Sequence, residues 1–228
     1  TLRPELGPVA LLITPAGIVA PVGPAWDVDR DAWWRTMEVN LRGTLLCTQL
    51  VLPEMVGRRR GRIVNISSHA GVFRWPLVSA YSVSKAAVVK LTENLAHETR
   101  RHGISVFSVH PGLLPIGLAE MALANSSPPD SYEAGVFAWI RQEIAEGRGA
   151  DPARAVELIV DLASGRYDNL SGRQLSVHDD IDAVLARIDD VRDTELYVLG
   201  VRTLPAAGQQ HSWLRRPAYA AHETVKSA

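Results

Sequence analysis

Three side chains near the middle of the sequence have the types and spacing needed to move a proton on and off a carbonyl oxygen. Tyr81 and Lys85 stand four residues apart, and Ser68 lies thirteen residues before Tyr81. Positions four apart share one face of a helix, so the Lys85 ammonium is expected to lower the phenol pKa, which is ordinarily about 10. Ser68 could hydrogen-bond the same substrate oxygen. These residue types suit an enzyme that transfers hydride to or from a carbonyl carbon.

The surrounding segments favour this chemistry over an exposed helix face, which is the simpler explanation of a Tyr and a Lys at this spacing. Ser68 follows the apolar run Arg62–Ser67, and Tyr81 opens the next helical pattern. The apolar run after that helix ends at Pro111 and Gly112. Ligands of open parallel sheets bind at the carboxyl ends of the strands, where these residues would lie.

Apolar runs alternate with helical patterns along the chain. The runs predict parallel strands at Val9–Ile13 (buried on both faces), Arg62–Ser67, Ile104–Val109 and Gln174–Val177. The helical patterns cover 29–55, 80–102, 151–162 and 180–191, and the mixed segment 113–150 is expected to be a helical excursion. The first helix is expected to be capped by Asp27 or Asp29, to carry an apolar face and to end at Pro53 and Gly57; that face comprises Trp33, Met37, Leu41, Leu45 and Leu52.

This alternation predicts an α/β fold, a Rossmann-like doubly wound parallel sheet with helices on both faces. No internal repeat or linker divides the sequence. We therefore expect a single domain over residues 1–203, followed by a polar tail at 204–228.

Several segments together resemble the short-chain dehydrogenase/reductase family. The resemblance covers residues 7 to about 178 and rests on these motifs: Val9 to Gly17, Met37 to Asn40, Ile63 to Gly71, Tyr81 to Lys85, and Val109 to Gly112. It implies an oxidoreductase that interconverts an alcohol and a ketone on a small organic substrate with NAD or NADP. It also implies a homodimer or homotetramer that pairs through the helices at 29–55 and 80–102.

The resemblance also implies roles for individual residues. Tyr81 would donate or accept the proton, Ser68 would orient the substrate oxygen, and Lys85 would tune Tyr81 and hold the nicotinamide ribose. Asn40 would keep a water in a proton relay behind Lys85. The cofactor would be contacted by Ala16, Gly17, Tyr81, Lys85, Pro111, Gly112 and Leu114.

One part of the family pattern is missing from the printed sequence. The family begins with a strand, a glycine-rich turn and a helix that receives the pyrophosphate. Here the Gly-x-Gly at Gly147 and Gly149 follows a helical pattern instead. We therefore expect an N-terminally incomplete domain. A non-catalytic scaffold that does not bind the dinucleotide alone, and a lyase or isomerase that reuses Tyr81, are the alternatives.

Composition gives no reason to expect a nucleic-acid or membrane partner. The 228 residues include 24 basic and 25 acidic side chains, a formal charge of −1, so the basic excess that binds phosphate backbones is lacking. No apolar run reaches the roughly 18 residues of a membrane span. The one cysteine, Cys47, is expected to be packed and suits a reducing compartment, so a cytoplasmic protein is expected.

Other groups of residues have simpler explanations. One group resembles a metal-ligand set: His178, Asp179, Asp180 and Asp182. It stands where a strand gives way to a helix, so helix capping is favoured and no metal is expected. His69 beside Ser68 does not make a Ser–His nucleophile, because no Gly-x-Ser-x-Gly turn is present. Trp75, Trp139 and the segment 113–147 are candidates for a pocket wall and lid, with core packing an equal alternative.

Overall fold

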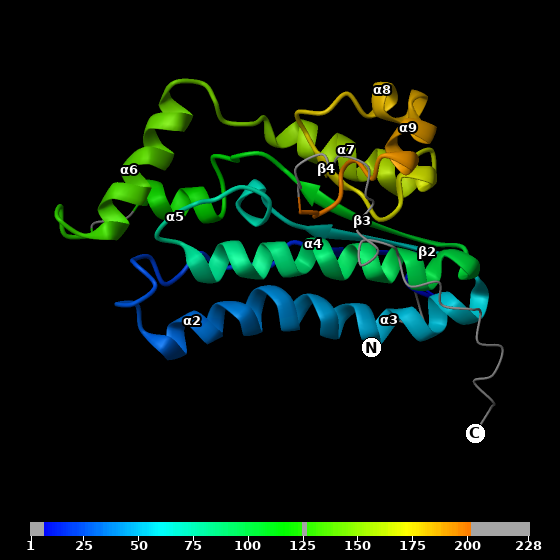
Figure 1. The fold of residues 1–228 in the computed structure, drawn as a ribbon, viewed down its shortest axis with the longest axis horizontal. Helices are drawn as coiled ribbons and strands as arrows, with labels where there is room; N and C mark the ends of the chain where they lie inside the picture. Colours follow the sequence, from blue (N-terminus) through cyan, green and yellow to red (C-terminus); the bar gives the residue numbers. More distant parts are fainter. Residues whose placement is uncertain (1–6, 125–126, 202–228) are drawn as a thin grey trace, which may run out of the picture.

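Four apolar runs of the sequence form one parallel sheet in the computed structural model, which describes residues 7–124 and 127–201 (Figure 1). The strands lie in the order β1-β2-β3-β4, and each pairs in parallel with the next. Their bounds are Leu11–Thr14, Gly61–Ile66, Ile104–His110 and Gln174–Ser176. The predicted α/β class and doubly wound sheet are confirmed. The predicted tail at 204–228 lies outside the described residues.

The two central strands are the most deeply buried part of the sheet. Ile63 and Val64 in β2, and Val106 and Phe107 in β3, are fully buried. The edge strand β1 differs from the prediction, which had it buried on both faces. It pairs only with β2 among the described strands, and Ile13 is 37% exposed, because an edge strand is covered on fewer sides than a central one.

One face of the sheet is covered by the two long helical segments that the sequence predicts (Figure 1). The first forms as α2 (Arg30–Met37), a π-helical turn η1 (Glu38–Arg42) and α3 (Gly43–Arg58). Asp29 caps α2 by accepting from the Ala32 N–H at 2.7 Å. The second segment is α4 (Ser79–Thr99), followed by a 3₁₀ turn and by Gly103 in the left-handed region.

The first helical segment differs from its prediction at its C-terminal end. Pro53 and Gly57 lie inside α3, which ends at Arg58 before the left-handed residue Arg59. Pro53 is on the exposed side, where water can bond the carbonyl that a proline's missing N–H leaves free.

The face of the first segment that turns toward the domain also differs from its prediction. The expected apolar face is only half-buried, and the fully buried positions are largely polar: Thr36, Asn40, Thr44 and Thr48, with Val51 and Met55. Leu46 and Leu50 are exposed. Cys47, expected to be packed, is exposed as well.

The other face of the sheet is covered by α7 (Pro152–Ser164), α8 (Ile181–Ala186) and α9 (Ile188–Asp193). Asp151 and Asp180 cap α7 and α8 with their carboxylates. The predicted excursion at 113–150 contains α5 (Leu118–Ala124) and α6 (Tyr132–Ala145), which extend beyond the sheet near the start of α4 (Figure 1). None of the helices in the described ranges has the length and apolarity of a membrane span.

Candidate active site

The site lies where β2 ends and α4 begins. A short 3₁₀ turn, η2 (His69–Gly71), follows Ser68 and packs against α4. Gly71 permits this approach, because a Cβ there would come within 2.6 Å of the Ala86 nitrogen and the Lys85 carbonyl carbon. The close contact brings the Ser68 turn against the helical turn that carries Tyr81 and Lys85.

Tyr81 and Ser68 meet in this corner. Tyr81 is 8% exposed, and burial raises the pKa of its phenol, because burial disfavours the phenolate. The Ser68 hydroxyl lies beside the phenol and partly offsets this effect on the pKa by stabilising the phenolate as a hydrogen-bond donor. The Ser68 oxygen accepts from the Ala70 N–H at 3.1 Å, which fixes the hydroxyl next to Tyr81.

Lys85 completes the group from the next turn of α4. Its side chain is buried, its Nζ donates to the Ile66 carbonyl at 2.8 Å, and Nζ lies 5.7 Å from the centre of the Tyr81 ring. Burial lowers the pKa of Lys85 to about 8. The predicted net lowering of the Tyr81 pKa is wrong for this structure, because desolvation of the buried phenol is the dominant effect.

Asn40 stands behind Lys85, in the π-helical turn η1. Its Oδ1 accepts from the Ile18 N–H at 2.8 Å, and its Nδ2 donates to the Ile18 carbonyl at 3.0 Å and to the Ser84 Oγ at 2.9 Å. Ser84 in turn donates to the Tyr81 carbonyl at 2.7 Å. Sequence reasoning missed Ser84, although its place between Tyr81 and Lys85 was a signal. Asn40 therefore ties the loop after β1 to the turn that carries Tyr81.

The residues predicted to contact a cofactor, apart from Tyr81 and Lys85, lie in two loops. Ala16 and Gly17 follow β1, and Pro111, Gly112 and Leu114 follow β3. Gly17 lies beside the site, because a Cβ on it would come within 3.3 Å of the Asn40 Oδ1 and 3.4 Å of the Lys85 Nζ. Ala16, next to it, is exposed. Gly112 has a φ of 82° and no room for a side chain, because a Cβ would lie 2.3 Å from that of Ala150.

The other two predicted cofactor contacts flank Gly112. Pro111 precedes it and is partly buried. Leu114 is partly buried against the cluster of apolar residues under α7. Ile116, two residues further along the chain, is 52% exposed.

Two tryptophan rings extend from Tyr81 toward α6. The Trp75 ring meets the Tyr81 ring edge-on at 6.1 Å, and Trp139 lies 5.5 Å from Trp75. Trp75 and Tyr81 belong to an apolar cluster that includes Val136, Phe137 and Ile140 of α6. These contacts join the two tryptophans to the site itself.

Ser67 and His69, the neighbours of Ser68, point elsewhere. Ser67 donates to Gln174 of β4 at 2.7 Å, as the alternation of side chains along a strand predicts. His69 stacks on His110, with ring centres 3.7 Å apart. Burial, together with the neighbouring imidazoles, lowers the pKa of His110 to about 3.

The acidic group after β4 is engaged in capping and pairing. Asp179 accepts from the Ser176 N–H at 2.8 Å, Asp180 from the Ala183 N–H at 3.0 Å, and Asp182 from the Tyr167 hydroxyl at 2.7 Å. No three acidic, histidine or cysteine side chains within the described ranges are placed to hold a metal ion.

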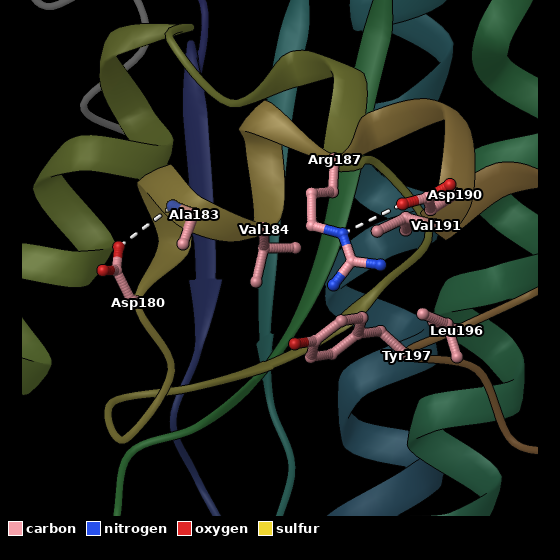
Figure 2. A pocket seen from close by; sticks show the side chains of 8 residues that line it. All are labelled: Asp180, Ala183, Val184, Arg187, Asp190, Val191, Leu196 and Tyr197. Carbon is pink, nitrogen blue, oxygen red and sulfur yellow. Dashed lines mark hydrogen bonds and ion pairs between the residues drawn. The ribbon is translucent and has the colours of Figure 1, made fainter.

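A cavity of about 250 Å³ lies beside this group, between α8, α9 and the segment that reaches Tyr197 (Figure 2). Figure 2 shows the Tyr197 ring below the Arg187 guanidinium, which pairs with Asp190. Neither Ser68 nor Tyr81 nor Lys85 lines this cavity, so it is separate from the candidate site.

Comparison with known proteins identifies the family. A family model described as short chain dehydrogenase matches residues 1–124, more than half of the chain. The chain belongs to the short-chain dehydrogenase family. The matched range contains Asn40, Ser68, Tyr81 and Lys85, so the site lies within the part of the chain that carries the family relationship.

Curated relatives from fungi and bacteria share this relationship. The chain is similar to a short chain dehydrogenase of Pseudocercospora fijiensis, with 34% identity over 187 residues that cover 79% of this chain and 59% of the relative. It is similar to the oxidoreductase UcpA of Salmonella typhimurium, with 37% identity over 169 residues, 74% of this chain and 63% of the relative. The chain thus spans about three fifths of the length of these relatives.

Solved structures share the fold. One is a gluconate 5-dehydrogenase from Burkholderia cenocepacia in complex with NADP and tartrate, with 26% identity, a TM-score of 0.65, and coverage of 77% of this chain and 65% of that chain. Another is an NAD⁺-bound xylitol dehydrogenase, with 26% identity, a TM-score of 0.66, and coverage of 77% and 70%. The two solved structures are described with different nicotinamide dinucleotides, NADP and NAD⁺.

Proposed function

We propose that this short-chain dehydrogenase interconverts an alcohol and a ketone on a small organic substrate, with NAD or NADP as the hydride carrier. The observation that carries the proposal is the meeting of a phenol, a hydroxyl and an ammonium in one buried corner, at the carboxyl end of β2. The dinucleotides named for the similar solved structures support the choice of cofactor. They do not favour NAD over NADP.

Tyr81 is the proposed proton donor in the reducing direction. Because burial raises the pKa of its phenol, Tyr81 holds its proton at neutral pH until negative charge develops on the substrate oxygen. The Ser68 hydroxyl donates to the same oxygen and keeps it next to the phenol. In the oxidising direction, the Tyr81 phenolate takes the proton of the alcohol and becomes the phenol. The Lys85 ammonium lies on the same side of α4 and favours the phenolate before this transfer.

The residues around Lys85 fit the sugar end of a nicotinamide cofactor. Gly17 has no side chain to block the approach to the Lys85 Nζ, and Ile66 takes only one of the three donors of the ammonium. When bound, the cofactor supplies or accepts the hydride. Ala16, Gly17, Pro111, Gly112 and Leu114 are the remaining proposed contacts, and Asn40 is the proposed support for a proton relay behind Lys85.

A second candidate is a chain that does not bind the dinucleotide by itself and acts as a scaffold. The observation that favours it is that no described strand is followed by a Gly-x-Gly turn into a helix, the element that receives a pyrophosphate. The sheet edge at β1 is also open within the described residues.

Titration of the chain with NADH and with NADPH, followed by nucleotide fluorescence, separates the two candidates. Saturable binding of either nucleotide supports the enzyme. If neither binds, the same titration is made on a version extended at its N-terminus by a strand, glycine-rich turn and helix. Binding only by the extended version supports the second candidate. Turnover in Tyr81→Phe comparable to that of the unchanged protein contradicts the proposed role of Tyr81.

We also propose that two or four copies associate through α3 and α4. Leu46, Leu50 and Val83 expose large apolar surfaces on these helices, and such surfaces mark interaction sites. Sedimentation of the protein and of a Leu46→Lys variant tests this. The variant is expected to sediment as a smaller species, and a monomeric unchanged protein contradicts the proposal.

The single cysteine suits the reducing cytoplasm, the compartment we propose.

A further inference from the structure

The side of the site that faces α6 is built from apolar and aromatic side chains. Trp75 packs its ring edge-on against Tyr81, with an angle of 82° between the ring planes. The apolar cluster around these two residues includes Ala70 and Val78 from one side of the site, and Val136, Phe137 and Ile140 of α6 from the other. The Tyr81 ring is therefore packed against apolar side chains on the side that faces Trp75 and α6.

The charged group that lies close to the Tyr81 ring is the Lys85 ammonium, whose Nζ is 5.7 Å from the ring centre. The two causes of the shift in the Tyr81 pKa are burial and the Ser68 hydroxyl. Arg74, in the loop that carries Trp75, is exposed. A polyol or a sugar acid brings several hydroxyls or a carboxylate, and each needs a polar partner once it leaves water. Beside Tyr81, the Ser68 hydroxyl is a polar partner for the reacting oxygen. The neighbours on the side of α6 are apolar and supply no partner for further hydroxyls or a carboxylate.

Trp139 extends this apolar surface outward. It lies 5.5 Å from Trp75 with the ring planes at 59°, and its side chain is 45% exposed. The path from Tyr81 through Trp75 to Trp139 is thus a continuous row of rings, which ends at solvent. An aromatic ring on a substrate would gain offset or edge-to-face contacts with such a row in addition to burying its surface.

We propose that the site takes ketones and secondary alcohols that carry an aromatic ring next to the reacting carbon, with the ring held by Trp75 and Trp139. This inference rests on the proposed function and narrows it to a substrate class. In the oxidation of 1-phenylethanol, the carbinol C–H bond breaks and its hydride passes to the oxidised nicotinamide. The hydroxyl proton passes to the Tyr81 phenolate, which becomes the phenol, and acetophenone is the product. In the reduction, both transfers are reversed.

Turnover of a matched pair of alcohols is the first test. 1-Phenylethanol and xylitol are compared with NAD⁺ and with NADP⁺, by absorbance of the reduced nucleotide. The expected result is a kcat/KM for 1-phenylethanol at least tenfold above that for xylitol. Equal or faster oxidation of xylitol overturns the substrate class and leaves the proposed function standing.

Binding of acetophenone, measured by ligand-detected NMR, is the second test and needs no turnover. Trp139→Ala is expected to weaken binding about tenfold, and Trp139→Phe, which keeps a ring, is expected to recover most of the loss. Trp34→Ala is the control, because Trp34 is similarly exposed at 58% and lies on α2. Its affinity for acetophenone is expected to equal that of the unchanged protein.

The two tests separate failure of the inference from failure of the proposed function. If neither alcohol is oxidised and neither nucleotide binds, the proposed function fails, and acetophenone binding alone decides the inference. Saturable binding that depends on Trp139 then supports an aryl-binding site. Absent binding, or equal loss in the Trp139→Ala and Trp34→Ala variants, overturns it.

Discussion

Replacing Lys85 by methionine is expected to stabilise the fold at neutral pH while it abolishes turnover. Lys85 is 3% exposed and its ammonium has one bond, to the Ile66 carbonyl, among the described residues. Charging a buried amine is unfavourable, and the pKa of Lys85 accordingly falls from 10.5 to about 8. Methionine fills a similar volume and needs no hydration.

The size of the effect follows from this pKa. One pKa unit corresponds to about 1.4 kcal/mol, so keeping the ammonium charged in the folded protein costs about 3 kcal/mol below pH 8. The methionine variant avoids this cost but leaves the Ile66 carbonyl without its partner, a loss of about 1 kcal/mol. The variant is therefore expected to be more stable than the unchanged protein by about 2 kcal/mol at pH 7.

The sign of the pH dependence is opposite to that of a lysine in a salt bridge. The folded pKa of Lys85 is below the unfolded one, so the unfolded chain binds more protons between pH 8 and 10.5. The unchanged protein therefore gains stability as pH rises through this window, by about 2 kcal/mol at pH 9.5. The gap between it and Lys85→Met closes over the same range.

Urea unfolding of both proteins between pH 7 and pH 9.5 measures this gap. Taking the difference removes the contributions of other groups, including the Tyr81 phenol, whose raised pKa makes stability fall above pH 10. Lys90→Met, which removes an exposed ammonium from the same helix, is the control and is not expected to reproduce the pH-dependent difference. A gap that stays constant with pH, or a less stable Lys85→Met at pH 7, would refute the reasoning.

Other expected outcomes concern the packing and polar contacts around the site. Asn40→Ala leaves three hydrogen-bonding groups of Ile18 and Ser84 without their partner and should lower the free energy of unfolding by about 2–4 kcal/mol in urea. Gly71→Ala should cost at least about 2 kcal/mol, because its Cβ meets backbone at 2.6 Å. Gly135 in α6 has open space around it, so Gly135→Ala should raise the free energy of unfolding by about 0.5–1 kcal/mol. A similar change in the free energy of unfolding of both glycine variants would contradict the packing argument. The His110 imidazole, with a pKa of about 3, should keep constant NMR shifts from pH 5 to 8, and a titration in that range would contradict its burial.

The sheet and the meeting of the site residues were predictable because they depend on local, periodic signals. Apolar runs such as Ile104–Val109 are confined to strands buried on both faces. The spacing of Tyr81 and Lys85 places them on adjacent turns of one helix. Ser68 at the end of a strand then has to lie near the start of the next helix, because parallel strands need a crossover.

The polar stripe of the first helical segment was not predictable from hydrophobic periodicity. Thr44 and Thr48 are buried, while Leu46 is exposed, the reverse of what an isolated amphipathic helix would show. Thr44 bonds the Asn40 carbonyl at 2.8 Å, so its hydroxyl is satisfied within the helix. The apolar residues are left on the outer side, which suits the proposed association of copies.

The pKa of Tyr81 also depends on information that spacing does not contain. Spacing places Lys85 near the phenol but does not report how deeply either group is buried. The structure shows both groups buried, and burial raises the pKa of the acid and lowers that of the base. The balance between a charge partner and desolvation is a property of packing, which only the three-dimensional arrangement supplies.

Transfer of deuterium from nicotinamide-4-²H-labelled NADH or NADPH to a ketone, detected by mass spectrometry of the product alcohol, tests the central claim most directly. The account predicts one deuterium on the carbinol carbon with the unchanged protein. It predicts no labelled product with Tyr81→Phe, although that variant binds the nucleotide equally well. Equal labelling by Tyr81→Phe, or binding of nucleotide and ketone by the unchanged protein without any transfer, would contradict it.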